Sequence, residues 1–165
     1  SLSILVTSHN KYSFLDEFEK NLEHFTQLDA EIIIVDDYSS DGSRDFLKDL
    51  AQRHRGINLI LNNKNLGSAE SRNLALYAAT REFVFFWDID DVVVLDELLH
   101  MLKESKAASA DLCKGNFGTH STIINSHLEL NPTSIIQDSI SNQAHSIVND
   151  MGYWRYLYKI GRAHV

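Results

Sequence analysis

The stretch Phe83-Val-Phe-Phe-Trp-Asp-Ile-Asp-Asp-Val92 decides the fold, because an apolar run stops abruptly in three acids. The residues from Phe83 to Trp87 are β-prone and uncharged. This composition predicts a strand that is buried on both faces, as in a parallel sheet covered by helices. Asp88, Asp90 and Asp91 then follow at the carboxyl end of that strand. We expect their carboxylates to converge, and two like charges ~4 Å apart repel by roughly 4 kcal/mol at an effective dielectric near 20.

A divalent cation would remove this repulsion. Carboxylate oxygens suit Mg²⁺ or Mn²⁺, and such sites hold the metal through one or two carboxylates while substrate phosphates complete the shell. Asp88, Asp90 and Asp91 are therefore candidate metal ligands. The plainer interpretation is that one of these acids caps the next helix and the others are solvated.

Composition limits the class of protein. The chain has 165 residues, enough for one substantial core, so we expect one domain or part of one. A formal net charge of -8 argues against a nucleic-acid or anionic-membrane surface, which would need a basic patch. Cys113 is the single cysteine, which favours a reducing, cytoplasmic compartment. No apolar run approaches the ~18 residues of a membrane span, so any attachment to the inner face of the membrane would be peripheral.

Apolar runs alternate with helical patterns along the first two thirds of the chain. Strands are predicted at 2–6, 31–35, 57–61 and 83–87, and helices are predicted to begin at Ser13, Ser43, Ser68 and Asp96, the first two serines as caps. The apolar positions expected to face inward include Phe14, Phe18 and Leu22 in the first helix and Leu98, Leu99 and Leu102 in the last. This alternation predicts an α/β fold in three layers, with helices on both faces of a mainly parallel sheet.

Polar clusters follow each predicted strand, at 7–10, 36–42, 62–67 and 88–91. Ligands of such sheets bind outside the carboxyl ends of the strands, where the strand order reverses. The linkers at the opposite edge of the sheet, around 28–30 and 80–82, are short compared with these clusters. We therefore expect the four clusters to build one composite site.

Four motifs in this order resemble the inverting family 2 glycosyltransferases of the GT-A fold. They are Ile4-Leu-Val-Thr-Ser-His-Asn10, Ile34-Val-Asp-Asp-Tyr-Ser-Ser-Asp-Gly-Ser43, Asn65-Leu-Gly-Ser-Ala-Glu-Ser-Arg-Asn73 and Trp87-Asp-Ile-Asp-Asp91. The resemblance covers roughly residues 2–106. It implies a three-layer αβα, Rossmann-like nucleotide-binding fold, a nucleotide-sugar donor that is commonly a UDP-sugar, and a bound Mn²⁺ or Mg²⁺.

The resemblance also implies roles for single residues, carried over by position. The nucleotide-binding set would be Thr7, Ser8, His9, Asn10, Asp36, Asp37, Arg72 and Asp88, and the metal set Asp90, Asp91 and Asp88. Within the nucleotide set, either Asp36 or Asp37 would accept from the uracil or ribose. This chain departs from the pattern at Thr7, where the family often has Pro, and at His9, where it often has Tyr; an imidazole can still stack on a base.

The reaction implied is transfer of a hexosyl or N-acetylhexosaminyl group, with inversion, to a hydroxyl of a saccharide or lipid-linked acceptor in cell-surface polysaccharide or glycoconjugate synthesis. Inversion needs a general base opposite the leaving group. In the family this base is an acid downstream of an aromatic segment such as 153–158, so we expect it beyond residue 165. Asp138 and Asp150 are weaker candidates. We therefore predict that residues 1–159 bind donor and metal but transfer little or no sugar.

The last third of the chain gives weaker patterns. Residues 1–159 would form one glycosyltransferase domain, with a nucleotide-binding half at 1–106 and the start of an acceptor-side region at 107–159. Strands are predicted at 110–114 and 122–124. Trp154, Leu157 and Tyr158 lie at helical spacing, which predicts a packing face or a wall of the acceptor site. We expect 160–165 to be a non-native tail, because Ile160-Gly-Arg-Ala-His-Val165 matches a peptide that a common sequencing adapter encodes in one frame.

Two other functions fit part of the sequence. Asp88-Ile-Asp-Asp-Val92 also resembles the nucleophile motif of haloacid-dehalogenase phosphatases, although that motif normally follows the first strand. A non-catalytic domain that binds nucleotide sugars is the second alternative, and the acid triad disfavours it. The segment 37–42 is superficially similar to a calcium loop, but Lys48 occupies the position of the bidentate Glu. Neither a Walker A sequence nor Gly-x-Gly-x-x-Gly occurs.

Overall fold

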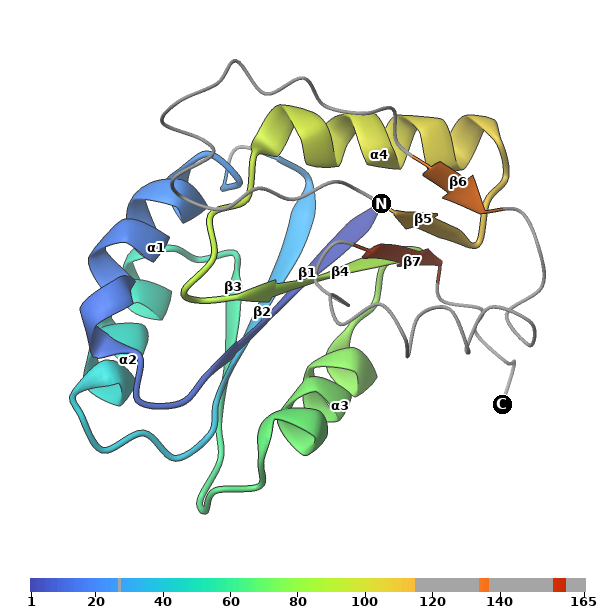
Figure 1. The fold of residues 1–165 in the computed structure, drawn as a ribbon. Helices are drawn as coiled ribbons and strands as arrows, with labels where there is room; N and C mark the ends of the chain where they lie inside the picture. Colours follow the sequence, from blue (N-terminus) through green and yellow to red (C-terminus); the bar gives the residue numbers. More distant parts are fainter. Residues whose placement is uncertain (27, 115–133, 137–155, 160–165) are drawn as a thin grey trace.

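The computed structural model describes residues 1–26, 28–114, 134–136 and 156–159 (Figure 1). Strands and helices alternate through the first four strands, as the sequence predicts. The elements are β1 (Leu2–Ser8), η1 (Tyr12–Phe14), α1 (Leu15–Glu23), β2 (Ala30–Asp36), α2 (Ser43–Arg53), β3 (Ile57–Leu61), α3 (Ser68–Ala78), β4 (Phe83–Asp88), α4 (Leu95–Ala107), β5 (Leu112–Lys114), β6 (Ser134–Ile136) and β7 (Tyr156–Lys159).

Within the described residues the strands form one sheet in the order β3-β2-β1-β4-β7-β5-β6. The first four of these strands run parallel. β7 is antiparallel to β4, and β5 is antiparallel to both β7 and β6. The order reverses beside β1, because β2 and β3 extend the sheet on one side while β4 joins on the other. This reversal is where α/β sheets bind their ligands.

Helices cover both faces of the parallel strands (Figure 1). Alternate residues of the strands point to opposite faces. Ile4, Ile34 and Trp87 belong to the core cluster that packs against α1, α2 and α4, whereas Leu5 and Ile33 pack against α3. The predicted three-layer α/β fold is therefore confirmed.

Trp87 joins the core to the acidic turn after β4. Its ring is 1% exposed and lies with its centroid 4.8 Å from that of Phe18 and 5.1 Å from that of Phe25. Its indole Nε1 donates a hydrogen bond to the carbonyl oxygen of Asp91 at 2.9 Å. The position of the acids is thus fixed from inside the protein.

The predicted serine caps are wrong. Ser13 lies inside η1, and the residue before α1 makes no side-chain capping hydrogen bond. Ser43 is the first residue of α2, behind an N-cap at Gly42. Asp41 satisfies this helix start instead, because its Oδ1 accepts from both the amide and the hydroxyl of Ser43, at 3.0 and 2.6 Å.

Other boundaries and helix faces also differ from the prediction. β1 and β4 continue to Ser8 and Asp88, because the parallel ladder pairs Thr7 with Asp88 beyond the apolar run. α4 begins at Leu95, one residue before the predicted start. The helical spacing predicts that Phe14 faces inward from the first helix, but it lies in η1, which has no buried residues, and is 40% exposed. Leu99 is 36% exposed because the buried face of α4 runs through Leu98 and Met101.

The end of the described chain corrects one prediction. Tyr156–Lys159 is a strand paired with β4, so the spacing of Leu157 and Tyr158 does not indicate a helix. The strand predicted at 110–114 is present as Leu112–Lys114. The strand predicted at 122–124, together with Asp138, Asp150, Trp154 and the tail at 160–165, lies outside the described residues. In the described part of the chain, no helix has both the length and the apolar character of a membrane span.

Candidate functional site

A polar cleft of about 350 Å³ opens at the carboxyl ends of the parallel strands. All four predicted polar clusters contribute to its wall. Its lining residues are Thr7, Ser8, His9, Lys11, Asp37, Asn65, Gly67, Ser68, Ser71, Arg72, Asp88 and Asp90. Most of the residues assigned to the nucleotide therefore come together in one place, with Asn10 and Asp36 as the exceptions. Of the acids assigned to the metal, Asp88 and Asp90 line the cleft and Asp91 does not.

Arg72 and Asp88 form the wall of the cleft on the α3 side. Asp88 is the register partner of Thr7, at the point where β1 and β4 end. It alternates along β4 with Trp87, so it faces α3 while the indole faces the opposite layer. Arg72 Nη2 lies 3.0 Å from Asp88 Oδ1 and 3.4 Å from Oδ2, and both side chains are mostly buried. The first acid of the triad is thus neutralised by a cation of the protein.

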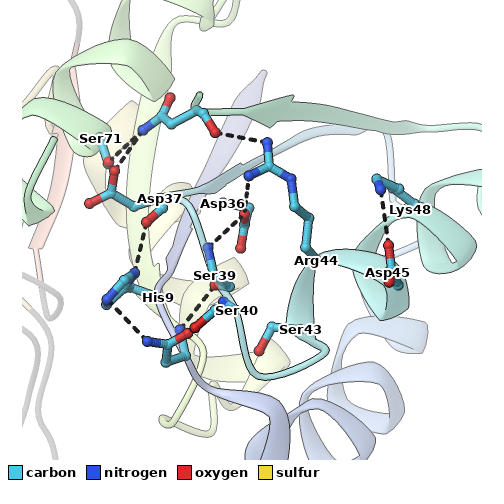
Figure 2. Close-up of polar contacts among 12 residues, drawn as sticks. His9, Asp36, Asp37, Ser39, Ser40, Ser43, Arg44, Asp45, Lys48 and Ser71 are labelled. Carbon is cyan, nitrogen blue, oxygen red and sulfur yellow. Dashed lines mark hydrogen bonds and ion pairs between the residues drawn. The ribbon is translucent and has the colours of Figure 1, made fainter. Parts of the chain in front are cut away.

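Asp37 holds the loop between β3 and α3. Its Oδ1 accepts from Asn62 Nδ2 at 2.9 Å and from the amide of Leu66 at 2.8 Å, and its Oδ2 accepts from the amide of Gly67 at 2.8 Å. Figure 2 shows this carboxylate beside Ser71 at the start of α3. Burial alone would raise the pKa of Asp37, but these hydrogen bonds outweigh it and lower the pKa. Asp37 is therefore ionised and already engaged by the protein.

His9 joins three loops around the cleft. Its Nδ1 lies 2.7 Å from the carbonyl oxygen of Asp37, which can only accept, so Nδ1 carries the proton. Nε2 is then an acceptor for the side-chain amides of Asn10 and Asn65, at 3.2 and 3.3 Å. These contacts fix the plane of the ring.

Asn10 serves the scaffold and is not part of the cleft wall. It adopts a positive φ of 51°, a conformation that Asn tolerates better than most residues. Its Oδ1 accepts from the amide of Ser40 at 2.8 Å, and its own amide donates to Ser39 Oγ at 3.0 Å. The amide of Tyr12 donates to Asp41 Oδ2 at 2.9 Å. Asn10 thus helps to hold the loop after β1 against the loop after β2.

Asp36 is the last residue of β2 and pairs with Arg44 of α2, whereas the next residue, Asp37, hydrogen-bonds to the loop that leads into α3. The side chain of Asp36 is fully buried, and its Oδ2 accepts from the amide of Ser39 at 3.2 Å (Figure 2). Arg44 Nη1 lies 3.6 Å from Oδ2, and Nη2 of the same arginine donates to the carbonyl of Asn62. Of the two acids assigned to the nucleoside, only Asp37 lines the cleft.

Asp88, Asp90 and Asp91 interact electrostatically, but they do not form a group of three metal ligands. In the described part of the chain, no group of three or more His, Cys, Asp or Glu side chains is arranged to hold a metal. Asp88 turns to Arg72, and Asp90 Oδ2 lies 2.5 Å from Lys11 Nζ. Asp91 is partly buried; burial raises its pKa, and the charges of Asp88 and Asp90 raise it further. The protein relieves the repulsion with its own basic side chains.

The chemistry of the cleft still fits a divalent cation. Asp90 is exposed in the cleft and already holds a positive charge against one oxygen. A metal bound through one or two carboxylates and completed by phosphates does not need a three-carboxylate cage. Among the lining residues, sequence reasoning assigned no individual role in the site to Lys11, Asn65, Gly67, Ser68 and Ser71. Of these, only Lys11 lies outside the predicted clusters and motifs, directly after the first cluster.

A family model described as Glycosyl transferase family 2 matches residues 3–150. The chain belongs to glycosyltransferase family 2. A cholesterol galactosyltransferase of Borreliella burgdorferi is 32% identical over 124 residues, which cover 75% of this glycosyltransferase chain and 34% of that protein. The teichuronic acid biosynthesis glycosyltransferase TuaG of Bacillus subtilis, whose assignment is provisional, is 31% identical over 102 residues, covering 62% of this chain and 40% of that protein.

Solved structures share the fold. TarS 1–349 of S. aureus in complex with UDP has a TM-score of 0.59 at 24% identity, over 68% of this chain and 34% of that chain. The mannosyltransferase PcManGT of Pyrobaculum calidifontis, in complex with GDP-Man and Mn²⁺, has a TM-score of 0.59 at 24% identity, over 67% of this chain and 34% of that chain. The GT-A fold of this glycosyltransferase chain is therefore shown. The match to the family model contradicts the phosphatase alternative.

The chain spans 34% and 40% of the length of these two curated relatives. The activity of the whole protein is therefore a matter of proposal.

Proposed function

We propose that residues 1–106 bind the donor of an inverting glycosyl transfer, a nucleotide-diphosphate sugar and by preference a UDP-sugar. The observation that carries the proposal is that one cleft contains two ion pairs, Arg72 with Asp88 and Lys11 with Asp90. Asp37 and His9 line the same cleft. The cleft lies where the strand order reverses, the usual ligand position of such sheets.

The charge of the cleft supports a metal-assisted diphosphate. Its charged lining residues are the cations Lys11 and Arg72 and the anions Asp37, Asp88 and Asp90, so the wall carries a formal net charge of -1 when histidine is not counted. An anionic diphosphate would be repelled by such a wall unless a cation accompanied it. When bound, Mn²⁺ or Mg²⁺ supplies Lewis-acid stabilisation of the charge that develops on the leaving diphosphate. We assign Asp90 as its principal ligand, with Asp88 and Asp91 beside it.

The nucleoside would lie at the other end of the cleft, against Thr7, Ser8, His9 and Asp37. Ser8 lines the cleft, and its Oγ is buried without a hydrogen bond to another described residue. The ring of His9 is held in place by two other loops and offers a flat apolar face for a base. Arg72 would support the pocket while it keeps Asp88 in position.

The acceptor and the catalytic base belong to our proposal as well. We place the start of the acceptor side in 107–159, of which only 107–114, 134–136 and 156–159 are described, and the base beyond residue 165. We propose a hexosyl or N-acetylhexosaminyl transfer to a saccharide or lipid-linked acceptor. The similarity to TuaG, which is named for teichuronic acid biosynthesis, supports a role in cell-surface polysaccharide synthesis. A cytoplasmic location, at most peripheral to the inner face of the membrane, suits the free and buried thiol of Cys113.

Titration calorimetry with UDP tests the proposal. We expect Mn²⁺ to raise the affinity for UDP at least about tenfold, because a cation held by Asp90 would offset the charge of the diphosphate. A titration with GDP in place of UDP tests whether the site prefers uracil to guanine. Equal UDP affinity with and without Mn²⁺, or no binding in either condition, would contradict the donor site.

A turnover assay with a UDP-sugar accompanies this titration. We expect the present chain to bind donor and metal yet to transfer little or no sugar, because our proposal places the base outside it. Sugar transfer by this chain would place the base within it. A non-catalytic binding domain is distinguished by the longer protein: if the chain extended past residue 165 also binds UDP with Mn²⁺ but transfers nothing to any acceptor tested, the transferase assignment fails.

A further inference from the structure

Lys11 is a basic side chain of the cleft to which the sequence motifs give no role. Its Nζ lies 2.5 Å from Asp90 Oδ2 and 5.3 Å from the centre of the Phe14 ring. We assign Asp90 to the metal. Without a metal, the ammonium group of Lys11 supplies the positive charge beside this carboxylate. We propose that Lys11 is a built-in counter-ion that competes with the divalent metal for Asp90 and, once displaced, contacts the diphosphate of the donor.

The ion pair is suited to exchange. The side chains of Lys11 and Asp90 are 36% and 37% exposed, and exposed ion pairs contribute little because water screens them. A divalent cation that a phosphate also coordinates can therefore replace a single ammonium. The pair of Arg72 and Asp88 differs, because its side chains are only 19% and 23% exposed and the guanidinium lies near both carboxylate oxygens. Arg72 is thus a fixed cation and Lys11 an exchangeable one.

The backbone of Lys11 stays in place while its side chain moves. Its amide donates to Ser43 Oγ at 3.2 Å, and the next amide, of Tyr12, donates to Asp41. Only the four-carbon stem needs to turn, and that stem is flexible. A metal on Asp90 repels the ammonium, whereas a diphosphate attracts it, and lysine is a common phosphate-binding residue. The contact between Lys11 and the diphosphate rests on the proposed donor site, whereas the competition for Asp90 does not.

The test measures two affinities of the whole chain that we expect to change in opposite directions. In Lys11→Met, Mn²⁺ without nucleotide should bind about two- to fivefold more tightly, because an exposed competing ion pair is gone. With saturating Mn²⁺, UDP should bind about tenfold more weakly, because a charge-assisted contact to phosphate is lost. Lys11→Arg should stay within about twofold of the original chain in the Mn²⁺ titration, because the positive charge is kept.

Lys48→Met is the matched control. Lys48 forms an exposed pair with Asp45 on α2 at 2.9 Å, and it does not line the cleft. This variant removes the same charge and should leave both affinities unchanged. Circular dichroism and the thermal midpoint confirm that each variant is folded.

Two results would overturn the inference. If Lys11→Met binds Mn²⁺ with equal or lower affinity, Lys11 does not compete for Asp90. If UDP affinity in saturating Mn²⁺ is unchanged in Lys11→Met, Lys11 does not contact the diphosphate. Failure of the donor site itself gives a different result, because the original chain would then bind no UDP while the Mn²⁺ titration without nucleotide could still show the competition.

Discussion

Asp37→Ala is expected to lower the free energy of unfolding by about 3–5 kcal/mol and to abolish UDP binding. The carboxylate is 3% exposed and accepts hydrogen bonds from Asn62, Leu66 and Gly67. Alanine would leave these donors without their acceptor and would release the loop that leads into α3, which carries Arg72. Urea denaturation followed by circular dichroism measures the first effect, and calorimetry with UDP and Mn²⁺ measures the second.

Asp29→Ala is the matched control for this change. Asp29 is 91% exposed and pairs with Arg81 at 3.4 Å, so its loss should change the free energy of unfolding by no more than about 0.5 kcal/mol. Equal stability of Asp37→Ala and Asp29→Ala would show that the hydrogen bonds of Asp37 do not hold the loop.

The pH dependence of stability gives a second measurement on Asp37. Its pKa is lowered in the folded state, because hydrogen bonds to the ionised form outweigh burial. A lowered pKa means that the unfolded chain binds the proton more readily, so this stabilisation is complete above the ordinary pKa of about 3.9 and is lost progressively as the pH falls below it, through the lower pKa of the folded state. Asp37→Asn removes this titration, and its stability should therefore fall less steeply than that of the original chain as the pH falls below about 4. The lowered pKa values of Glu31 and Asp41 remain in both proteins.

Asp90→Asn is expected to remove the effect of Mn²⁺ on UDP affinity, a loss of at least about tenfold at saturating metal. Asp90 is the acid of the cleft whose only described side-chain partner is the exchangeable Lys11, and an amide is a much weaker metal ligand than a carboxylate. UDP affinity without metal should not fall, because the variant removes a negative charge from the cleft. Calorimetry with and without Mn²⁺ measures both quantities.

Asp45→Asn controls for the loss of one carboxylate. Asp45 is 85% exposed on α2, where it pairs with Lys48, and it should retain the full response to Mn²⁺. An Asp90→Asn protein that still responds to Mn²⁺ would show that the metal binds through other acids.

The fold and the general position of the cleft follow from the sequence, because both depend on periodic patterns. An apolar run such as Phe83 to Trp87 predicts a strand, and carboxyl ends of parallel strands must share one edge of the sheet. The details depend on alternation and on partners that no local pattern specifies. Asp36 and Asp37 are equivalent in sequence, yet one pairs with Arg44 and the other lines the cleft.

The acids after β4 show the same limit. Sequence spacing predicts three charges close together, but it does not reveal that Lys11, from a segment 79 residues away, pairs with Asp90. The strand Tyr156–Lys159 was missed for a related reason, because its pairing with β4 is a tertiary contact that overrides the helical spacing of its residues.

The pairing of β4 with β7 also governs how the protein can be divided. β4 carries the acids and is bordered by β1, from the start of the chain, and by β7, whose residues 157–159 pair with 83–85. A chain that ended at residue 106 would contain every proposed donor-binding residue, yet one edge of β4 would have unpaired backbone groups. Such edges recruit strands from other molecules, so this shortened form would be prone to aggregate. The donor-binding half therefore needs β7 to cover this edge during synthesis and purification.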